Sequence, residues 1–430
     1  MKQPKMLRNF IWNTVGQLTY MVCQFLCGIF VVSLAGNQVS GVYNTALTAT
    51  NIFLSIASYG MYSFQVSDLS KKYSDSAYIR SRVWTCAAAS VLCGGFVVVN
   101  AFTGENPYSA QQSVCVLLFL GYRMVESFTD IFNAIDQRGG RLDIVGKTYA
   151  LRGIVMIASF IATLRLTQDI VLTLALMLAA SLAVFFAYSL PQARRLYTPA
   201  SVVQARVAAL LWECAPLAVY SFLNTTTASI PKLMLGRMLG ETALGIYGPV
   251  TQPVLLLQVG ATYLFNPFIT VFADSYARRN KRGFWRAVLG VQGVVLALLP
   301  VGLFVAAFLG RWGLAAFVSA ELADYQYLLA PMVVSAILTA LVLFYSMVLT
   351  VMRCMKGLIA ANACAIVVSA LASAPCIARW ELQGTTYAAI AAQMVQLLLL
   401  GATALLMARR HFSAAGPLPK PEDPFDGLPS

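Results

Sequence analysis

Charged side chains are scarce in this sequence. Only 11% of its 430 residues are Asp, Glu, Lys or Arg, whereas 59% are hydrophobic. An average soluble domain carries about 25% charged residues. Because so little charge cannot cover a soluble surface of this size, we expect lipid to surround much of the chain. The composition therefore predicts an integral membrane protein.

Histidine is almost absent, and no cysteine motif is present. The chain has one histidine, His411, and its nine cysteines form no CxxC pair. A His-based catalytic triad and a His-containing zinc site are therefore excluded. We expect the cysteines to pack as small apolar side chains. We accordingly expect no metal site, no cofactor and no catalytic residue.

Long runs of apolar residues make up most of the sequence. A membrane-spanning helix needs about 20 predominantly apolar residues, and lipid favours helices because each backbone amide must be bonded within its own segment. The runs cover residues 10–35, 41–66, 83–102, 110–133, 146–164, 169–190, 212–236, 243–272, 286–309, 326–350, 357–378 and 384–407. They predict an all-α protein of about twelve transmembrane helices. The proline-rich residues 412–430 predict a disordered tail.

The net charge is +13, and the positions of the basic residues along the chain predict the topology. Basic residues gather in alternate connections between the apolar runs. Examples from these connections are Arg8, Lys71 and Arg82 (both after the second run), Arg141, Arg194, Arg282, Arg353 and Arg410. This positive-inside pattern predicts that both termini lie in the cytoplasm. Because no aromatic-basic module accompanies these residues, we expect no nucleic-acid partner.

The sequence contains an internal repeat. Residues 35–43 and 239–247 each lie between two apolar runs, and they share two glycines and a tyrosine. The matched pairs are Gly36 with Gly240, Gly41 with Gly245, and Tyr43 with Tyr247. We therefore expect two six-helix lobes, 1–195 and 196–411. Because each lobe has an even number of spans, the two lobes have the same orientation in the membrane. This predicts that a pseudo-two-fold axis along the membrane normal relates them and that a cavity lies between them.

Polar residues recur at helical spacing within several apolar runs. Those in the first two runs and their counterparts in the second half are Asn13, Gln17, Gln24, Asn44, Asn51, Asn224 and Gln258. One interpretation is hydrogen bonding between helices, which is common in membrane bundles. The other is a wet cavity that holds a hydroxyl-rich ligand such as a sugar. We take these residues as candidate substrate contacts.

Charged residues also lie inside the apolar runs. Arg123, Glu126 and Asp130 are spaced i, i+3 and i+7, so they share one helix face. Buried charges in membranes face the bundle interior and are functional by default, although a self-satisfied ion pair that fixes packing is the alternative. Lys232 and Arg237 lie in the seventh run and just beyond it. They either extend to the membrane interface or attract an anion such as a phosphate.

Three stretches resemble the polysaccharide and O-antigen flippase family of the multidrug/oligosaccharidyl-lipid/polysaccharide (MOP) exporter superfamily. They are residues 59–68, 123–152 and 230–247. Members of that family translocate undecaprenyl-pyrophosphate-linked oligosaccharides across the bacterial inner membrane. The resemblance implies a MATE-like fold, in which two lobes rock around a cationic central cavity.

The resemblance also implies roles for particular residues. Arg123 and Lys232 become candidate contacts for a diphosphate or an acidic sugar, whereas Glu126, Asp130 and Asp68 set the local charge or carry a coupling ion, proton or sodium. The implied partners are the lipid-linked oligosaccharide, membrane lipids, and the polymerase and glycosyltransferases of the same pathway.

Two other functions stay open. A drug/cation antiporter shares the fold, but it favours a more acidic pocket in the first lobe. A membrane polymerase or ligase of polysaccharide places catalytic residues in a large external loop. The longest external connection expected here, about residues 310–325, contains little beyond Arg311, Glu321 and Asp324.

Overall fold

The computed structural model describes residues 3–68, 72–103, 106–197, 207–265 and 269–413. Across these ranges the chain forms helices and short connections, without a β-strand. The first group of helices comprises α1 (Gln3–Ser58), α2 (Met61–Ser67), α3 (Asp75–Phe102), α4 (Ala110–Arg138), α5 (Leu142–Thr167) and α6 (Ile170–Val184), followed by the π-helical turn η1 (Phe185–Ser189) and α7 (Leu190–Arg194). The second group comprises α8 (Val207–Phe265), α9 (Ile269–Ala277), α10 (Lys281–Phe317), the 3₁₀ segment η3 (Ala320–Leu328), α11 (Leu329–Val351) and α12 (Met355–Ser413).

The length and apolar character of these helices fit a membrane. Eight helical stretches among the described residues are long and apolar enough to cross one. Three of the long helices, α1, α8 and α12, are bent at Gly36, Gly240 and Glu381, so each of them joins two expected spans. Helix α4, with 29 residues, is about as long as α3 and α5 but carries buried charge. The all-α membrane fold is confirmed, and the count of twelve spans stays a prediction.

The two repeat turns have the same backbone conformation. Gly36 has φ 80° and ψ 179°, and Gly240 has φ 83° and ψ −178°. A side chain at either position would meet a strongly unfavourable backbone geometry, which only glycine adopts readily. The glycines matched in the sequence therefore have a physical reason to be glycines, and the repeat extends to three dimensions.

The second matched glycine pair brings the two halves into contact. A Cβ atom at Gly41 would overlap the backbone carbonyl of Glu241, and a Cβ atom at Gly245 would overlap the backbone carbonyl of Asn37. Asn37 and Glu241 each lie four residues before their glycine, so the two contacts are equivalent. Ser40 adds a hydrogen bond from its Oγ to the Gly245 carbonyl at 3.1 Å. We call this quasi-symmetric contact the glycine seam.

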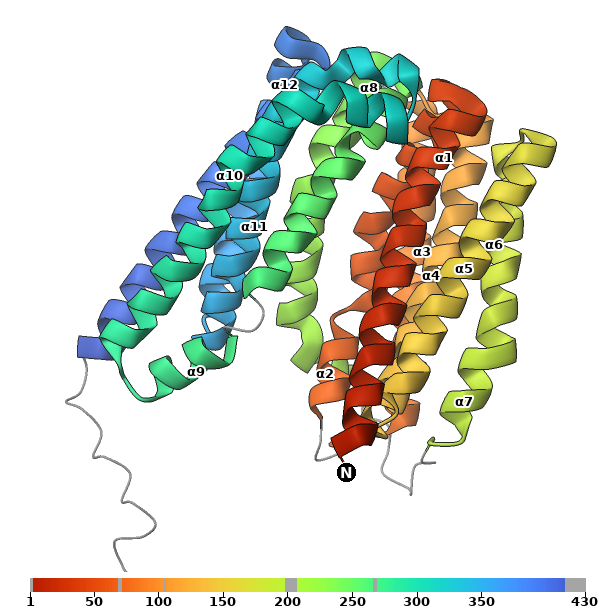
Figure 1. The fold of residues 1–430 in the computed structure, drawn as a ribbon. Helices are drawn as coiled ribbons and strands as arrows, with labels where there is room; N and C mark the ends of the chain where they lie inside the picture. Colours follow the sequence, from red (N-terminus) through yellow and green to blue (C-terminus); the bar gives the residue numbers. More distant parts are fainter. Residues whose placement is uncertain (1–2, 69–71, 104–105, 198–206, 266–268, 414–430) are drawn as a thin grey trace, which may run out of the picture.

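The glycine seam lies where the two groups of helices come together, at the end of the molecule opposite the N-terminus (Figure 1). From there α10, α11 and α12 lean away from the first group toward the end that carries the N-terminus (Figure 1). Helix α1 of the first group and helix α8 of the second pack against each other.

The start of α8 stays against the first group at the N-terminal end. Leu210 and Cys214 of α8 share a buried cluster with Met61 and Tyr78. Lys72, in the connection between α2 and α3, forms an ion pair with Glu213. The two groups therefore touch through α8 at both ends of the molecule.

The structure differs from the expected layout in two connections. The expected external loop at 310–325 is largely helical, because α10 continues to Phe317 and η3 follows at once. Arg311 and Asp324 approach each other there at 3.4 Å. Phe412 and Ser413, assigned to the tail, belong to α12. The rest of the expected tail, Lys71 and the link at 198–206 lie outside the described residues.

Candidate functional site

The charged residues of α4 form a buried ion pair. Arg123 Nη1 lies 2.6 Å from Glu126 Oε2, and the two side chains are 7% and 13% exposed. Arg123 Nη2 donates to Asn51 Oδ1 at 2.9 Å. Because Asn51 lies on the returning part of α1, the guanidinium joins two helices of the first half. The pair foreseen in the sequence is therefore formed.

Tyrosine hydroxyls complete the surroundings of the two carboxylates. Tyr20 donates to Glu126 Oε1 at 2.7 Å, and its hydroxyl also lies 2.9 Å from that of Tyr122. Tyr149 donates to Asp130 Oδ1 at 3.3 Å. Both carboxylates thus accept hydrogen bonds from neutral donors inside the bundle, which is what buried charge requires.

Two further arginines belong to this region and were not predicted as site residues. Arg82 of α3 is fully buried and donates from Nη1 to the Ala57 carbonyl and, at 2.8 Å, to Ser127 Oγ. It lies inside α3, which begins at Asp75, eight residues before the expected run at 83–102. Arg152 of α5 is 2% exposed and stacks 5.4 Å from the Tyr20 ring centroid.

Arg152 differs from the other arginines in its hydrogen bonding. None of its three guanidinium nitrogens has a hydrogen-bond partner among the described residues. Its position inside an expected span, 146–164, was the signal that could have identified it. With Arg82, Arg123, Glu126 and Asp130 it forms what we call the first-half cluster, which contains three cations and two anions.

A cavity lies between the halves. It has a volume of about 480 Å³ and lies between the returning part of α1 and the two arms of α8. Its polar lining includes Asn44, Thr48, Asn51, Ser55, Ser58, Thr225, Ser229, Lys232, Thr251 and Gln252. We call it the central cavity. The polar stripe expected on the second apolar run therefore faces the space between the halves.

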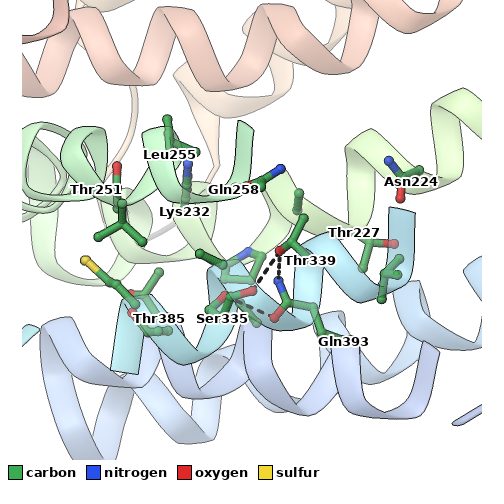
Figure 2. A pocket seen from close by; sticks show the side chains of 18 of the residues that line it. Asn224, Thr227, Lys232, Thr251, Leu255, Gln258, Ser335, Thr339, Thr385 and Gln393 are labelled. Atoms are coloured by element: carbon green, nitrogen blue, oxygen red, sulfur yellow. Dashed lines mark hydrogen bonds between the residues drawn. The ribbon is translucent and has the colours of Figure 1, made fainter. Parts of the chain in front are cut away.

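A second cavity lies within the second half and is shown in Figure 2. It has a volume of about 350 Å³ and is lined by α8, α11 and α12. Its polar lining includes Asn224, Thr227, Lys232, Thr251, Gln258, Ser335, Thr339, Thr385, Gln393 and Gln396. We call it the second-half cavity. Asn224 and Gln258, expected as substrate contacts, both line it.

Hydrogen bonds hold one wall of the second-half cavity in place (Figure 2). Ser335 donates to Gln393 Oε1 at 3.0 Å, and Gln393 Nε2 donates to Thr339 Oγ1 at 2.7 Å. These three residues were not predicted, although each is a polar residue inside an expected apolar span. Ser335 and Thr339 also lie at helical i, i+4 spacing, which was the available signal.

Lys232 is one of five residues that line both cavities; the others are Thr225, Ala228, Thr251 and Leu255. It is the only charged residue of the described lining of either cavity. Among the described residues, its ammonium group makes no hydrogen bond and no ion pair. A cation of this kind, within a low-dielectric bundle and beside a cavity, attracts an anion.

The remaining candidates lie elsewhere. Gln17 donates to Asn13 at 3.1 Å, and Gln24 is partly buried on the same helix. Arg237 Nη2 bonds Thr103 O and Oγ1, each at 3.2 Å, close in the chain to Gly240 of the repeat turn.

Asp68 ends α2 rather than joining the first-half cluster. It accepts the backbone amides of Lys72 and Tyr73 at 2.9 and 3.1 Å and the Tyr78 hydroxyl at 3.2 Å. Its carboxylate therefore orders the connection between α2 and α3.

Known proteins share both the sequence pattern and the fold. The family model of polysaccharide biosynthesis proteins matches residues 6–275. The capsular polysaccharide biosynthesis protein CapF of Staphylococcus aureus is 20% identical over 305 residues, which cover 68% of this chain and 74% of that protein.

Solved structures of two transporter types have a similar fold. The lipid II flippase MurJ, in an inward closed conformation, matches with a TM-score of 0.68 at 12% identity, over 95% of this chain and 90% of that one. An inward-facing multidrug resistance MATE family transporter of the MOP superfamily matches with a TM-score of 0.64 at 13% identity, over 94% of this chain and 98% of that one. The chain therefore shares its fold with these transporters. Since the family model covers more than half of the sequence, the chain belongs to the polysaccharide biosynthesis protein family.

Proposed function

We propose that this protein flips undecaprenyl-pyrophosphate-linked oligosaccharide repeat units across the bacterial cytoplasmic membrane by alternating access. The observation that carries the proposal is the unpaired Lys232, placed where the central cavity meets the second-half cavity. A diphosphate crossing a membrane needs a cation that is not already neutralised by a carboxylate. Lys232 meets that requirement.

The other parts of the substrate find matching surroundings. Its sugar hydroxyls need hydrogen-bond partners away from water, and side-chain amides and hydroxyls line both cavities. Its polyprenyl chain needs an apolar environment, which lipid-facing side chains such as Leu166, Trp212 and Phe308 indicate around the bundle. The resemblance to CapF, whose name places it in capsular polysaccharide biosynthesis, supports a glycan cargo.

Alternating access requires contacts between the halves that open in turn. The glycine seam closes one end, and the Lys72–Glu213 ion pair joins the halves at the other. With the N-terminus in the cytoplasm, as the basic connections predict, the glycine seam is the external closure. Opening it while the inner contact holds exposes the cavities to the outside.

Deletion of the gene tests this function. We expect lipid-linked oligosaccharide to accumulate on the cytoplasmic leaflet while its synthesis continues, and we expect the wild-type gene to restore export. Lys232→Met should fail to restore it, whereas Lys281→Met, a change at an exposed lysine at the start of α10, should restore it.

Other outcomes would assign the chain to another class. Normal surface polysaccharide together with increased drug sensitivity would indicate an antiporter. Repeat units that appear outside but stay unpolymerised would indicate a polymerase.

A further inference from the structure

We infer that the second-half cavity binds the sugar next to the diphosphate and selects a sugar without negative charge. This inference rests on the proposed function, which requires a glycan but not this location or this selectivity. The second-half cavity has a volume of about 350 Å³, within the roughly 300–1,000 Å³ typical of small-molecule sites.

The lining matches a neutral sugar in its hydrogen-bonding chemistry. Sugar hydroxyls donate and accept, and so do the hydroxyl of Ser335 and the side-chain amides of Asn224 and Gln393. Asp and Glu are absent from the described lining of this cavity. A site of this composition recognises hydroxyl groups by direct hydrogen bonds rather than by charge.

Part of the site is organised before a ligand arrives. Gln393 is held between Ser335 and Thr339 by two of the hydrogen bonds in Figure 2, which fix the orientation of its amide.

The position of Lys232 sets the order of the substrate along the two cavities. Because Lys232 lines both of them, a diphosphate held there places its first sugar at the mouth of the second-half cavity. When the Lys232 ammonium group binds the diphosphate, the second-half cavity has no other cation in its described lining. The carboxylate of a uronic acid bound there would therefore be unpaired. Burying an unpaired carboxylate is strongly unfavourable, and this penalty excludes acidic sugars.

Cysteine protection tests the inference. In a variant without native cysteines, Ser335→Cys reports on the second-half cavity and Ser229→Cys on the central cavity, one helical turn before Lys232. The probes are undecaprenyl pyrophosphate alone, the same lipid carrying a neutral trisaccharide, and the same lipid carrying a uronic acid as first sugar. The measurement is the rate of N-ethylmaleimide labelling in membrane vesicles.

We expect all three lipids to protect Ser229→Cys, and only the neutral glycolipid to protect Ser335→Cys at low concentration. The acidic glycolipid should need about tenfold more, which corresponds to about 1.4 kcal/mol. In the Ser335→Cys background, Gln393→Leu should weaken protection by the neutral glycolipid about tenfold through its lost hydrogen bonds. Gln383→Leu, on the same helix but outside the lining, should not.

Each contrary result has a separate meaning. Equal protection of Ser335→Cys by the lipid without sugar would show that the second-half cavity holds something other than the glycan. Protection of Ser229→Cys alone would place the sugar elsewhere and leave the proposed function standing. Equal protection by both glycolipids would overturn the charge selectivity, and protection at neither cysteine would overturn the proposed function itself.

Discussion

The interiors of the two halves differ in charge although their turns are the same. Gly36 and Gly240 share one backbone conformation. The first half, however, contains the five charged residues of the first-half cluster, whose three arginines are buried, whereas the second half lines its cavity with neutral polar groups and Lys232. The repeat therefore preserves the backbone that forms the seam, while the interior chemistry has diverged. This is consistent with function lying in sites placed on a fold rather than in the fold.

The two halves also differ in whether their cations are paired with other residues of the protein. Arg123 is occupied by Glu126 and Asn51, so it has little capacity left for a substrate anion in this conformation. Lys232 is unoccupied among the described residues and lines both cavities, whereas Arg152, which also lacks a hydrogen-bond partner there, lines neither. We therefore propose that the first-half cluster stabilises packing and that Lys232 provides the anion site.

The largest expected effect comes from breaking the buried pair. Arg123→Ala leaves Glu126 unpaired, which should lower the free energy of unfolding by about 3–5 kcal/mol. The double variant Arg123→Ala with Glu126→Ala should recover most of that loss, as measured by thermal unfolding in detergent. Near-normal transport by the stable double variant would confirm a packing role, and folded but inactive protein would instead make Arg123 a substrate contact.

The glycine seam tests whether the two halves are equivalent where they meet. Gly41→Ala and Gly245→Ala each place a Cβ atom against a facing carbonyl, and overpacking of this kind costs about 1–3 kcal/mol. Both changes should reduce the fraction of molecules in which the glycine seam is closed, and they should do so equally. The labelling rate of a cysteine introduced by Asn37→Cys measures that fraction. Gly290→Ala is the control, since open space surrounds that position. An effect of only one of the two seam changes would show that the contact is not symmetric in energy.

Arg152 sharpens the comparison within the first-half cluster. Its guanidinium has no hydrogen-bond partner among the described residues, so replacing it by Met removes charge and leaves no broken pair. Arg152→Met should change the free energy of unfolding by less than about 1 kcal/mol, because apolar residues replace buried charge without loss in many proteins. A loss as large as that of Arg123→Ala would mean that Arg152 neutralises the carboxylates at a distance.

The smallest expected effect concerns the exposed Lys72–Glu213 ion pair at the N-terminal end. The hydrogen bond that Lys72 donates to Glu213 raises the pKa of its amine. On the basic side the pair is therefore complete below the ordinary pKa of lysine and is lost as the pH rises through the raised pKa. On the acidic side it is lost as the pH falls through the pKa of Glu213, which the hydrogen bond from Lys72 lowers. Glu213→Gln should slightly increase access to the cavities from that end at low salt, and the difference should disappear at high salt. A difference that survives high salt would argue against a screened ion pair.

The fold was largely predictable from the sequence because lipid leaves a simple pattern. Run length identified the helices, and small residues identified the repeat turns, where glycine is required by geometry. The boundary of α3 was missed because a buried Arg82 looks like a loop charge in a one-dimensional pattern.

The candidate site was predictable only in part. Lys232, Asn51 and Asn224 were found because polar groups inside apolar runs are conspicuous. Which cation is neutralised depends on contacts between distant helices, such as that between Arg123 and Asn51, and no local pattern contains them. The network around Gln393 joins α11 to α12 and was invisible for the same reason.

The central claim is that Lys232, and not Arg123, is the cation available to the diphosphate. Its most direct test is the binding of undecaprenyl pyrophosphate to purified protein in detergent as a function of salt. Lys232→Met should weaken binding by about tenfold or more and reduce its salt dependence, Lys232→Arg should retain most of it, and the Arg123→Ala, Glu126→Ala double variant should bind as the wild type does. Unchanged binding by Lys232→Met, with loss of binding in the double variant, would contradict the account.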